Sequence, residues 1–432
     1  MRLYDTLTRQ AQELPAPPGP IRMYVCGPTV YGRAHVGNAR PFVIGMWLRR
    51  WLREHGYEVT LVHNITDVND KIYAAAPGDS ARLAAKASEW YLEDTGALGL
   101  GRPDHEPRAT ETIPEILSLI EELVERGLAY AADGDVYFRV ATYPAYGALS
   151  GRLDEQSARN PSEEQEPSEL KEDPRDFALW KAHKDGEDTW WESPWGRGRP
   201  GWHIECSAMA EKFLGPAFEI HGGGLDLIFP HHENEIAQSR GAGRDFARLW
   251  MHNGMLRFVG EKMSKSLGNV VTLRDVVERW GRETLLAFFL TAHWSKPVDF
   301  SDDTMEQART QWEQFRDAYR VVHVEQDAPS WEEFVAVLDD DFNTPQALSI
   351  LHRWRAAGRL ELLDRGLAVF GLGVRAAEQA PAEVVDLAVR RREAREQADY
   401  DEADRLRDRL AAAGWEVQDV AGEPGYRLIP RR

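Results

Sequence analysis

The chain has 432 residues, a formal net charge of −19 and only two cysteines. Its length predicts two to four domains. Its negative net charge argues against non-specific binding along nucleic acid, but it does not exclude a local basic groove. The sequence has no apolar run of membrane-spanning length, no signal-peptide pattern and too few cysteines for a disulfide framework, so we expect a cytoplasmic protein.

The N-terminal region has the pattern of a strand–helix–strand unit. Ile21–Val25 alternates like a strand, apolar residues at 43–52 recur at helical spacing, and Glu58–Ile65 reads as a second strand. Such a unit predicts a parallel sheet with a right-handed crossover. Cys26 and the loop around His35 then fall where open α/β sheets bind ligands. The chain has no convincing Gly-x-Gly-x-x-Gly after the first strand, which removes the main support for a nicotinamide or flavin enzyme.

The loop His35-Val36-Gly37-Asn38 lies just before the first predicted helix. A helix N-terminus with free N–H groups suits a phosphate, and a glycine allows a ligand to approach the backbone closely. Taken alone, this stretch is also compatible with an ordinary loop histidine beside a turn glycine.

The middle of the chain predicts an inserted region. Residues 113–124 form an amphipathic helix, and Val136–Val140 follows an Asp-Gly turn as a strand. Residues 151–176 are rich in Glu, Asp, Pro and Ser and predict a solvated loop or a partly disordered segment. Ordered structure resumes near Phe177 and leads into a helix that carries Cys206.

The stretch His221–Glu235 has the strongest metal-binding pattern. Pro230 suits a first helical residue, and on a helix His231 and Glu235 share one face. Together with the two cysteines they would supply sulfur, nitrogen and oxygen ligands for one zinc ion; the four residues are Cys26, Cys206, His231 and Glu235. The spacing alone equally fits two buried thiols and a solvated helix face. The zinc-protease pattern is excluded because Ile236 stands where a second histidine would be needed.

Downstream, Lys262-Met263-Ser264-Lys265-Ser266 places two lysines and two serines on one short loop. Such a cationic, hydrogen-bonding loop favours a polyphosphate ligand over a merely solvated basic surface. From residue 303 onward the pattern is helical, with Asn343-Thr344-Pro345 as a helix start. A turn near 378–383 suggests a boundary, after which helix Tyr400–Ala413 precedes a hairpin at 415–429.

These motifs together resemble the class I aminoacyl-tRNA synthetases, most closely the cysteine-specific family. His35-Val36-Gly37-Asn38 is similar to the "HIGH" element, with Val for Ile and Asn for the last His, and Lys262–Ser266 is identical to "KMSKS". The resemblance extends over nearly the whole chain through further stretches: 24–31, 64–67, 103–110, 201–206, 231–239 and 341–345.

The resemblance implies a set of functional residues. Zn²⁺, one per chain, would be held by Cys26, Cys206, His231 and Glu235. ATP, with Mg²⁺, would meet His35, Asn38 and Lys265, with Lys262 in the same loop and Gly224 and Asp226 beside the adenosine. The amino-acid and adenylate pocket would be lined by Gly27, Thr29, Thr66 and Trp202. His35, Asn38, Lys262 and Lys265 would be the catalytic group.

The implied activity is the ATP-dependent activation of L-cysteine and its transfer to tRNA(Cys) by a monomer that does not bind membranes. A related ligase that passes the cysteinyl group to an amino-sugar would share the zinc site and the lysine loop. The hairpin at 415–429 and the stretch 233–238 favour tRNA. A catalytically silent RNA-binding or zinc-binding module is disfavoured by the intact lysine loop and His35 element.

The expected fold class is α/β. A Rossmann-like parallel-sheet catalytic domain with an inserted domain is followed by a helical bundle and a small α+β anticodon-binding domain. The expected boundaries are 1–110 and 201–250 for the two halves of the catalytic domain, 111–200 for the insert, 251–302 for the lysine loop and stem-contact region, 303–380 for the bundle and 381–432 for the C-terminal subdomain.

Overall fold

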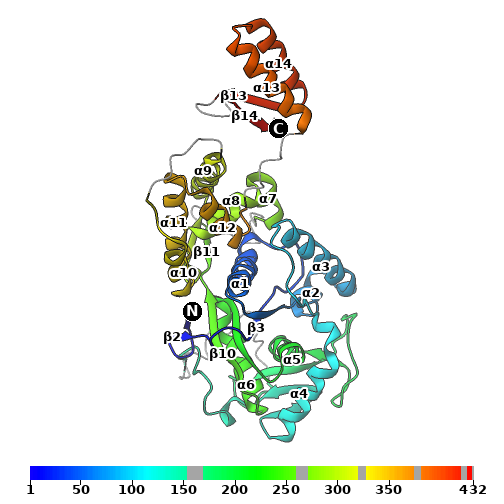
Figure 1. Cartoon of the computed structure of the whole chain (residues 1–432). Helices are drawn as coiled ribbons and strands as arrows, with labels where there is room; N and C mark the ends of the chain where they lie inside the picture. The colour runs from blue at the N-terminus through cyan, green and yellow to red at the C-terminus, as the bar shows by residue number, and fades with distance from the viewer. Residues whose placement is uncertain (153–168, 259–270, 320–326, 374–380, 420–425, 431–432) are drawn as a thin grey trace. The chain divides into compact units, whose positions relative to one another are not determined.

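The structure is a computed structural model that describes residues 1–152, 169–258, 271–319, 327–373, 381–419 and 426–430 (Figure 1). It divides into two compact units. The first comprises Met1–Arg309 with Glu332–Leu348, and the second comprises Thr310–Trp331 with Ser349–Arg432. Among the described residues, none of the helices is both long enough and apolar enough to cross a membrane.

A four-stranded parallel sheet forms the centre of the first unit. Its strand order is β10–β9–β3–β4, and every neighbouring pair runs parallel. The strands are β3 (Pro20–Val25), β4 (Glu58–His63), β9 (Ala217–Gly224) and β10 (Phe246–Asn253). Because the strands are parallel, the residues after Val25, His63 and Gly224 all gather at one edge of the sheet.

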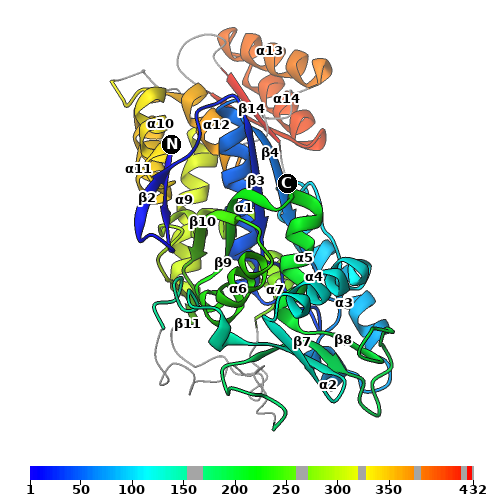
Figure 2. The same ribbon diagram turned by 90° about the horizontal axis from the view of Figure 1, so that it is seen from below.

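Helices cover both faces of this sheet. Helix α1 (Val36–Glu54) lies beside β3 and β4 (Figure 2), and its Gly45 approaches Val25 closely. The preceding residue, Tyr24, packs instead with α5 (Trp202–Leu214) and α6 (Glu233–Gly241). Successive side chains of a strand point to opposite faces, so α1 covers one face and α5 with α6 cover the other.

A second, antiparallel sheet lies between the two halves of the parallel-sheet region in the sequence. Its order is β5 (Ala129–Ala132), β6 (Asp135–Phe138), β7 (Phe177–Ala182) and β8 (Gly198–Pro200). Helix α4 (Ile113–Glu125) packs its apolar face on this sheet, and the same cluster includes Ile204 and Ala208 of α5. The insert therefore shares its core with the helix that carries Cys206.

Smaller elements complete the first unit. A hairpin of β1 (Arg2–Asp5) and β2 (Gln10–Glu13) begins the chain, and β11 (Leu256–Phe258) pairs in parallel with β12 (Val298–Phe300). The remaining helices are α2 (Asp70–Ala75), α3 (Ser80–Gly96), α7 (Leu273–Trp280) and α8 (Arg282–Leu290). Short turns of helix occur at Ala109–Glu111, Val140–Thr142, Leu225–Leu227 and Ile228–His232.

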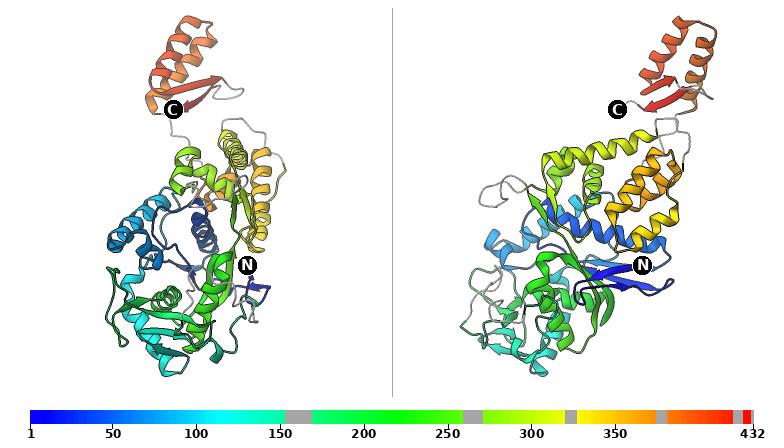
Figure 3. Two further views of the ribbon diagram at one scale, coloured as in Figure 1. Left: turned by 180° about the vertical axis from the view of Figure 1, so that it is seen from behind. Right: turned by 90° about the vertical axis from the view of Figure 1, so that its left-hand side faces the viewer.

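The C-terminal part of the chain is mainly helical. Its helices are α9 (Asp302–Ala318), α10 (Trp331–Asp339), α11 (Thr344–Ala356), α12 (Leu360–Val369), α13 (Ala382–Glu396) and α14 (Tyr400–Ala412). An antiparallel hairpin of β13 (Trp415–Asp419) and β14 (Tyr426–Pro430) follows. Helices α13 and α14 lie side by side on this hairpin (Figure 3), and Leu406, Leu410 and Trp415 belong to their shared core.

The predicted elements occur with small differences at their ends. The strand expected at Glu58–Ile65 ends at His63. Beyond it the chain leaves the sheet, and Thr66 pairs with Thr29 only as an isolated bridge. The helix expected to open at Pro230 starts later, because Phe229 has an extended conformation and Ile228–His232 forms a wider helical turn before α6. Most of the acidic segment, the whole lysine loop and half of the 378–383 turn lie outside the described residues.

The side chain of Asp5 joins the N-terminal hairpin to the central sheet. The Asp5 carboxylate is fully buried and accepts hydrogen bonds from the backbone N–H groups of Trp250 (2.8 Å) and Thr8 (2.9 Å). Hydrogen bonds to a buried charged acceptor contribute more than neutral ones, and their loss also leaves amide donors unsatisfied.

We expect Asp5→Ala to destabilise the first unit by about 3 kcal/mol and to lower its melting temperature by roughly 5–10 °C. Thermal unfolding followed by tryptophan fluorescence measures this. The matched control is Asp340→Ala, which removes an exposed ion pair with Arg2 and should change stability by less than about 0.5 kcal/mol. Equal melting temperatures for the two variants would contradict the role given to Asp5.

Candidate functional site

The two cysteines of the chain meet at the carboxyl edge of the parallel sheet. Cys26 follows β3 directly, and Cys206 lies in the second turn of α5. Their sulfur atoms are 3.9 Å apart, and both residues are buried. Burial raises the pKa of Cys26, which keeps its proton and donates to Cys206. Burial also opposes ionisation of Cys206, but the hydrogen bond from Cys26 and the neighbouring His231 outweigh it and lower its pKa to about 6.

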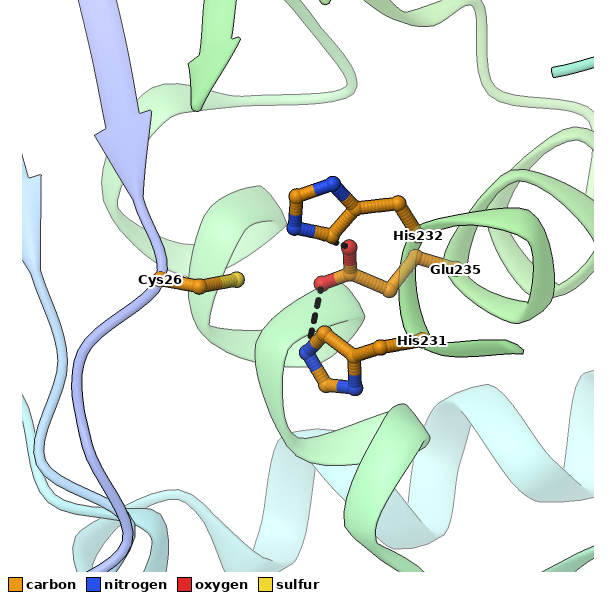
Figure 4. Close-up of side chains that lie close together, drawn as sticks. All are labelled: Cys26, His231, His232 and Glu235. Atoms are coloured by element: carbon orange, nitrogen blue, oxygen red, sulfur yellow. Dashed lines mark ion pairs between the residues drawn. The ribbon is translucent and has the colours of Figure 1, made fainter. Parts of the chain in front are cut away.

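A histidine–carboxylate group faces these sulfur atoms. In Figure 4 the Glu235 carboxylate lies between the rings of His231 and His232, and the Cys26 sulfur points toward it. Glu235 Oε1 is 3.8 Å from His231 Nε2, and Oε2 is 3.9 Å from His232 Nε2. One ligand atom from each of Cys26, His231, His232 and Glu235 lies within 4.8 Å of the others.

These separations fit a shared metal ion. Zinc bonds of about 2.0–2.3 Å in a tetrahedron place neighbouring ligand atoms roughly 3.3–3.8 Å apart. Glu235 has no exposed surface, and neither of its oxygen atoms has a hydrogen-bond partner among the described residues. The same holds for His232 Nε2. A buried carboxylate that has imidazole neighbours but accepts no hydrogen bond is costly, so the donor set fits a cation bound at this point.

The four residues predicted as zinc ligands are therefore brought together, with one addition. Cys206 touches Cys26 and hydrogen-bonds to His231, whereas His232 supplies the fourth atom of the tightest group. His232 Nδ1 is already engaged with His252 Nε2 at 2.7 Å. Sequence spacing favoured His231 over His232 because only the former is four residues from Glu235 on a regular helix, but the wider turn before α6 turns both rings toward the carboxylate.

Three further histidines surround this group, and sequence reasoning missed them. His203 Nδ1 lies 3.0 Å from His231 Nδ1, and His221 Nε2 lies 3.0 Å from Glu235 Oε2. His252 bridges His232 to the hydroxyl of Thr6 at 2.7 Å. Burial lowers the pKa of His203, His232 and His252, in the last case to about 3, so these rings are neutral. His203 lies at the start of α5, His221 lies within β9 and His252 lies next to the last residue of β10. The presence of histidines in these predicted elements was the signal that the sequence offered.

Two other buried polar residues of α6, Glu233 and Asn234, hold the segment 146–150 in place. Glu233 accepts hydrogen bonds from the backbone N–H groups of Gly147 (2.9 Å) and Ser150 (2.8 Å). The Tyr146 hydroxyl donates to Asn234 Oδ1 at 2.6 Å. Glu233, Asn234 and Glu235 are all fully buried, so three successive polar residues serve different partners within one helical turn.

A cavity of about 320 Å³ lies at the N-terminus of α1 and is lined by Thr29, His35 and Asn38. His35 caps the helix by accepting a hydrogen bond from the Gly37 N–H through Nδ1, at 3.1 Å. A side chain at position 37 would collide with the His35 ring, so glycine is required there. The helix dipole and the cavity together suit an anionic group beside His35.

The residues predicted for the amino-acid pocket lie near either this cavity or the sulfur site. Backbone hydrogen bonds from Val30 to Thr66 (3.0 Å) and from Thr66 to Pro28 (3.2 Å) hold Thr29 beside Thr66. Gly27 is pressed against the Asn64 backbone, where a Cβ atom would lie 1.8 Å from the carbonyl oxygen. The Trp202 ring stacks on His231 with 4.2 Å between centroids.

The residues predicted near the adenosine lie at the end of β9. Gly224 ends that strand, and Asp226 is exposed on the next turn, close enough that a Cβ at Gly224 would touch its carboxylate. Lys262 and Lys265 lie outside the described residues. A further buried carboxylate, Glu205, was missed by sequence reasoning; burial chiefly, and then nearby Cys206 and Asp67, raise its pKa well above the usual range.

Solved structures of low sequence identity share this architecture. A methionyl-tRNA synthetase of Mycobacterium tuberculosis in complex with methionyl-adenylate aligns with a TM-score of 0.56 and 17% identity, over 82% of each chain. A LeuRS–tRNA–LeuAMS ternary complex of Agrobacterium radiobacter K84 aligns with a TM-score of 0.59 and 13% identity, over 83% of this chain and 85% of the other. These likenesses concern the fold.

Closer relatives establish the family. Residues 13–310 match the tRNA synthetases class I (C) catalytic domain, and residues 333–357 match the DALR domain. "Cysteine–tRNA ligase" of Laribacter hongkongensis is 45% identical, with 99% of each chain covered. "Cysteine–tRNA ligase" of Symbiobacterium thermophilum is 43% identical over 97% of this chain and 98% of its own. The fold class predicted from the sequence is confirmed, and the chain belongs to the cysteine–tRNA ligase family of class I tRNA synthetases.

Proposed function

We propose that the chain activates L-cysteine with ATP to form cysteinyl-adenylate and then transfers the cysteinyl group to the 3′ end of tRNA(Cys). The observation that carries this proposal is the buried sulfur–imidazole–carboxylate group, which lies at the same sheet edge as the anion-suited cavity at the N-terminus of α1. Relatives with nearly complete mutual coverage carry the name cysteine–tRNA ligase, which supports the same activity.

In the first step the cysteine carboxylate attacks the α-phosphate of ATP and pyrophosphate leaves. The step needs no protein nucleophile, so positioning and charge stabilisation account for the rate. His35, Asn38 and the N–H groups at the start of α1 hold the phosphates of MgATP. Lys262 and Lys265 would contribute positive charge to the same phosphates. Gly224 and Asp226 border the adenosine, while Gly27, Thr29, Thr66 and Trp202 border the amino acid.

Selectivity for cysteine arises at the metal ligands. Cys26, Cys206, His231 and Glu235 would hold one Zn²⁺, and His232 is a further ligand candidate. A zinc ion bound there would take the substrate sulfur as a thiolate, for which a serine hydroxyl is a poor substitute. Packing alone separates near-isosteric side chains by roughly 10–200-fold, so this direct recognition of sulfur removes the need for an editing site.

The RNA partner is tRNA(Cys), and the C-terminal α13–β14 region would read its anticodon end. We further propose that the protein acts as a monomer in the cytoplasm, where tRNA is charged for translation. The segments 1–110 and 201–250 would form the catalytic domain, 111–200 the insert, 251–302 the lysine-loop region, 303–380 the bundle and 381–432 the anticodon-binding part. The ordered core of α13, α14 and the β13–β14 hairpin supports the last of these.

Exchange of labelled pyrophosphate into ATP, measured with each amino acid in turn, tests the proposal. Only cysteine should support rapid exchange, and total tRNA should stimulate AMP release from ATP and cysteine. Stimulation by an amino-sugar in place of tRNA would assign the chain to the related ligase chemistry instead. Exchange with another amino acid at a comparable rate would refute the assignment of cysteine.

We expect Cys206→Ala to lose the bound zinc and to reduce cysteine-dependent exchange at least about 100-fold, because removing a ligand or its supporting shell weakens both metal and substrate binding. Zinc content by atomic absorption and ATP affinity by calorimetry accompany the assay; ATP affinity should stay unchanged. Lys212→Ala, a part-exposed position on the same helix, is the control that should retain zinc and activity. Normal exchange by a zinc-free Cys206→Ala enzyme would rule out the metal's role.

We expect His35→Asn to slow adenylate formation on the order of 100-fold, as loss of one charge-stabilising donor does in other active sites, with little effect on cysteine affinity. Asparagine is itself a good N-cap residue, so the start of α1 should remain intact. Pre-steady-state adenylation measures the effect, and an unaltered melting temperature verifies the fold. An adenylation rate equal to that of the wild type would exclude a catalytic contact from the imidazole.

A further inference from the structure

His63, the last residue of β4, is buried at the carboxyl edge of the parallel sheet, although it takes no part in binding ATP, cysteine or the metal in the proposed function. Its two ring nitrogens contact different elements. Nδ1 lies 2.8 Å from the carbonyl oxygen of Val25, the last residue of β3, and Nε2 lies 2.5 Å from the hydroxyl of Tyr91 on α3. The imidazole therefore joins two segments that are far apart in the sequence.

The direction of both hydrogen bonds follows from the groups involved. A carbonyl oxygen can only accept, so Nδ1 of His63 carries the proton and Nε2 accepts from the Tyr91 hydroxyl. Burial is the main cause that lowers the pKa of His63 to about 4, and burial also raises the pKa of Tyr91. Both groups are therefore in the neutral forms that these two hydrogen bonds require.

On its Nδ1 side, His63 begins a row of contacts that holds the chain carrying Cys26. Val25, which accepts from His63, immediately precedes Cys26. The next residue after His63 is Asn64, whose Oδ1 accepts from the N–H of Gly27 at 2.9 Å. Contacts on both sides of Cys26 thus come from the end of β4, and they determine where the Cys26 sulfur lies.

On the Nε2 side, Tyr91 supports the segment that leads to His35. The Tyr91 ring is buried in a cluster with Val30 and Ala34, which belong to the connection between β3 and α1. The same three residues border the cavity that His35 lines. The hydrogen bond from Tyr91 to His63 therefore fixes the polar end of a ring whose apolar surface packs beneath the phosphate side of the proposed site.

We propose that His63 is a positioning residue for adenylate formation, because its two hydrogen bonds set the sulfur site and the phosphate-binding end of α1 relative to each other. The inference rests on the proposed function, in which the cysteine sulfur is held at the metal ligands while the cysteine carboxylate reaches the α-phosphate of ATP. A misplacement of about 1 Å between reacting groups can slow a reaction on the order of 100-fold. Each substrate keeps its own contacts, so the loss falls on the rate constant and not on KM.

Three variants of the full-length enzyme and one control test the proposal. Tyr91→Phe removes one hydroxyl and keeps the ring, whereas His63→Asn keeps an amide donor for the Val25 carbonyl and is too short to accept from Tyr91. The third variant carries both changes. The control is Tyr57→Phe, because the Tyr57 hydroxyl is also buried and donates to the Pro15 carbonyl at 2.5 Å. Tyr57 precedes β4 and thus lies at the opposite edge of the sheet.

Tyr91→Phe and His63→Asn should each lower the maximal rate of cysteine-dependent pyrophosphate exchange roughly 10- to 100-fold, with KM for ATP and for cysteine within about twofold of the wild type. The double variant should be no slower than the slower single variant, because both changes remove the same hydrogen bond. Single-turnover transfer from preformed cysteinyl-adenylate to tRNA should stay within about twofold, since the two substrates are already joined. Tyr57→Phe should match the wild type, and zinc content should be unchanged in all four.

A wild-type exchange rate in Tyr91→Phe, losses that multiply in the double variant, or an equal slowing of exchange and transfer would overturn the proposal while leaving cysteine activation by the wild type intact. A wild-type enzyme that shows no cysteine-dependent exchange would instead overturn the proposed function, and this inference with it. If His63→Asn loses its zinc and its thermal transition, it has not folded, and Tyr91→Phe then carries the test because it removes only one oxygen atom.

Discussion

The organisation of the catalytic edge depends on one buried carboxylate, that of Glu235. It has no exposed surface and faces sulfur and imidazole groups that are themselves buried. Burial lowers the pKa of His232 and of His252, so these two rings are neutral and supply no compensating positive charge. Isolated charge in such surroundings costs several kcal/mol, and the proposed metal ion removes that cost by supplying the missing charge. The ring of histidines then orients the ligands, as second-layer hydrogen bonds do in metalloproteins.

The parallel sheet explains why so many separate segments converge there. Strands β3, β4 and β9 end at one edge, so the loops carrying Cys26, Thr66 and Gly224 become neighbours despite their distance in sequence. Helix α1 approaches that edge from one face and α5 with α6 from the other. The phosphate-suited end of α1 and the sulfur site therefore both lie at the carboxyl ends of these strands.

The sequence predicted the architecture where the physical signal is local. Alternation marked β3, helical spacing marked α1 and α4, and the motifs of the lysine loop and the His35 loop identified the family. The four residues predicted from chemistry as zinc ligands also lie close together. The histidines at positions 203, 221 and 252 were missed because their roles depend on contacts between elements far apart in the chain. The involvement of His232 was missed because a regular helix was assumed where a wider turn precedes α6.

Helix α6 departs from the usual arrangement of a surface helix, because residues 233–239 are buried without interruption. Glu235 faces the proposed metal site, Glu233 accepts hydrogen bonds from the backbone of residues 147 and 150, and Asn234 accepts one from Tyr146. No side chain in this stretch is exposed to solvent, so none of its positions is free to vary without affecting a buried contact. We therefore expect substitutions at every position of this stretch to be poorly tolerated. Variants of Glu235 would lose the proposed metal ion, whereas variants of Glu233 and Asn234 would lose the hydrogen bonds that hold residues 146–150.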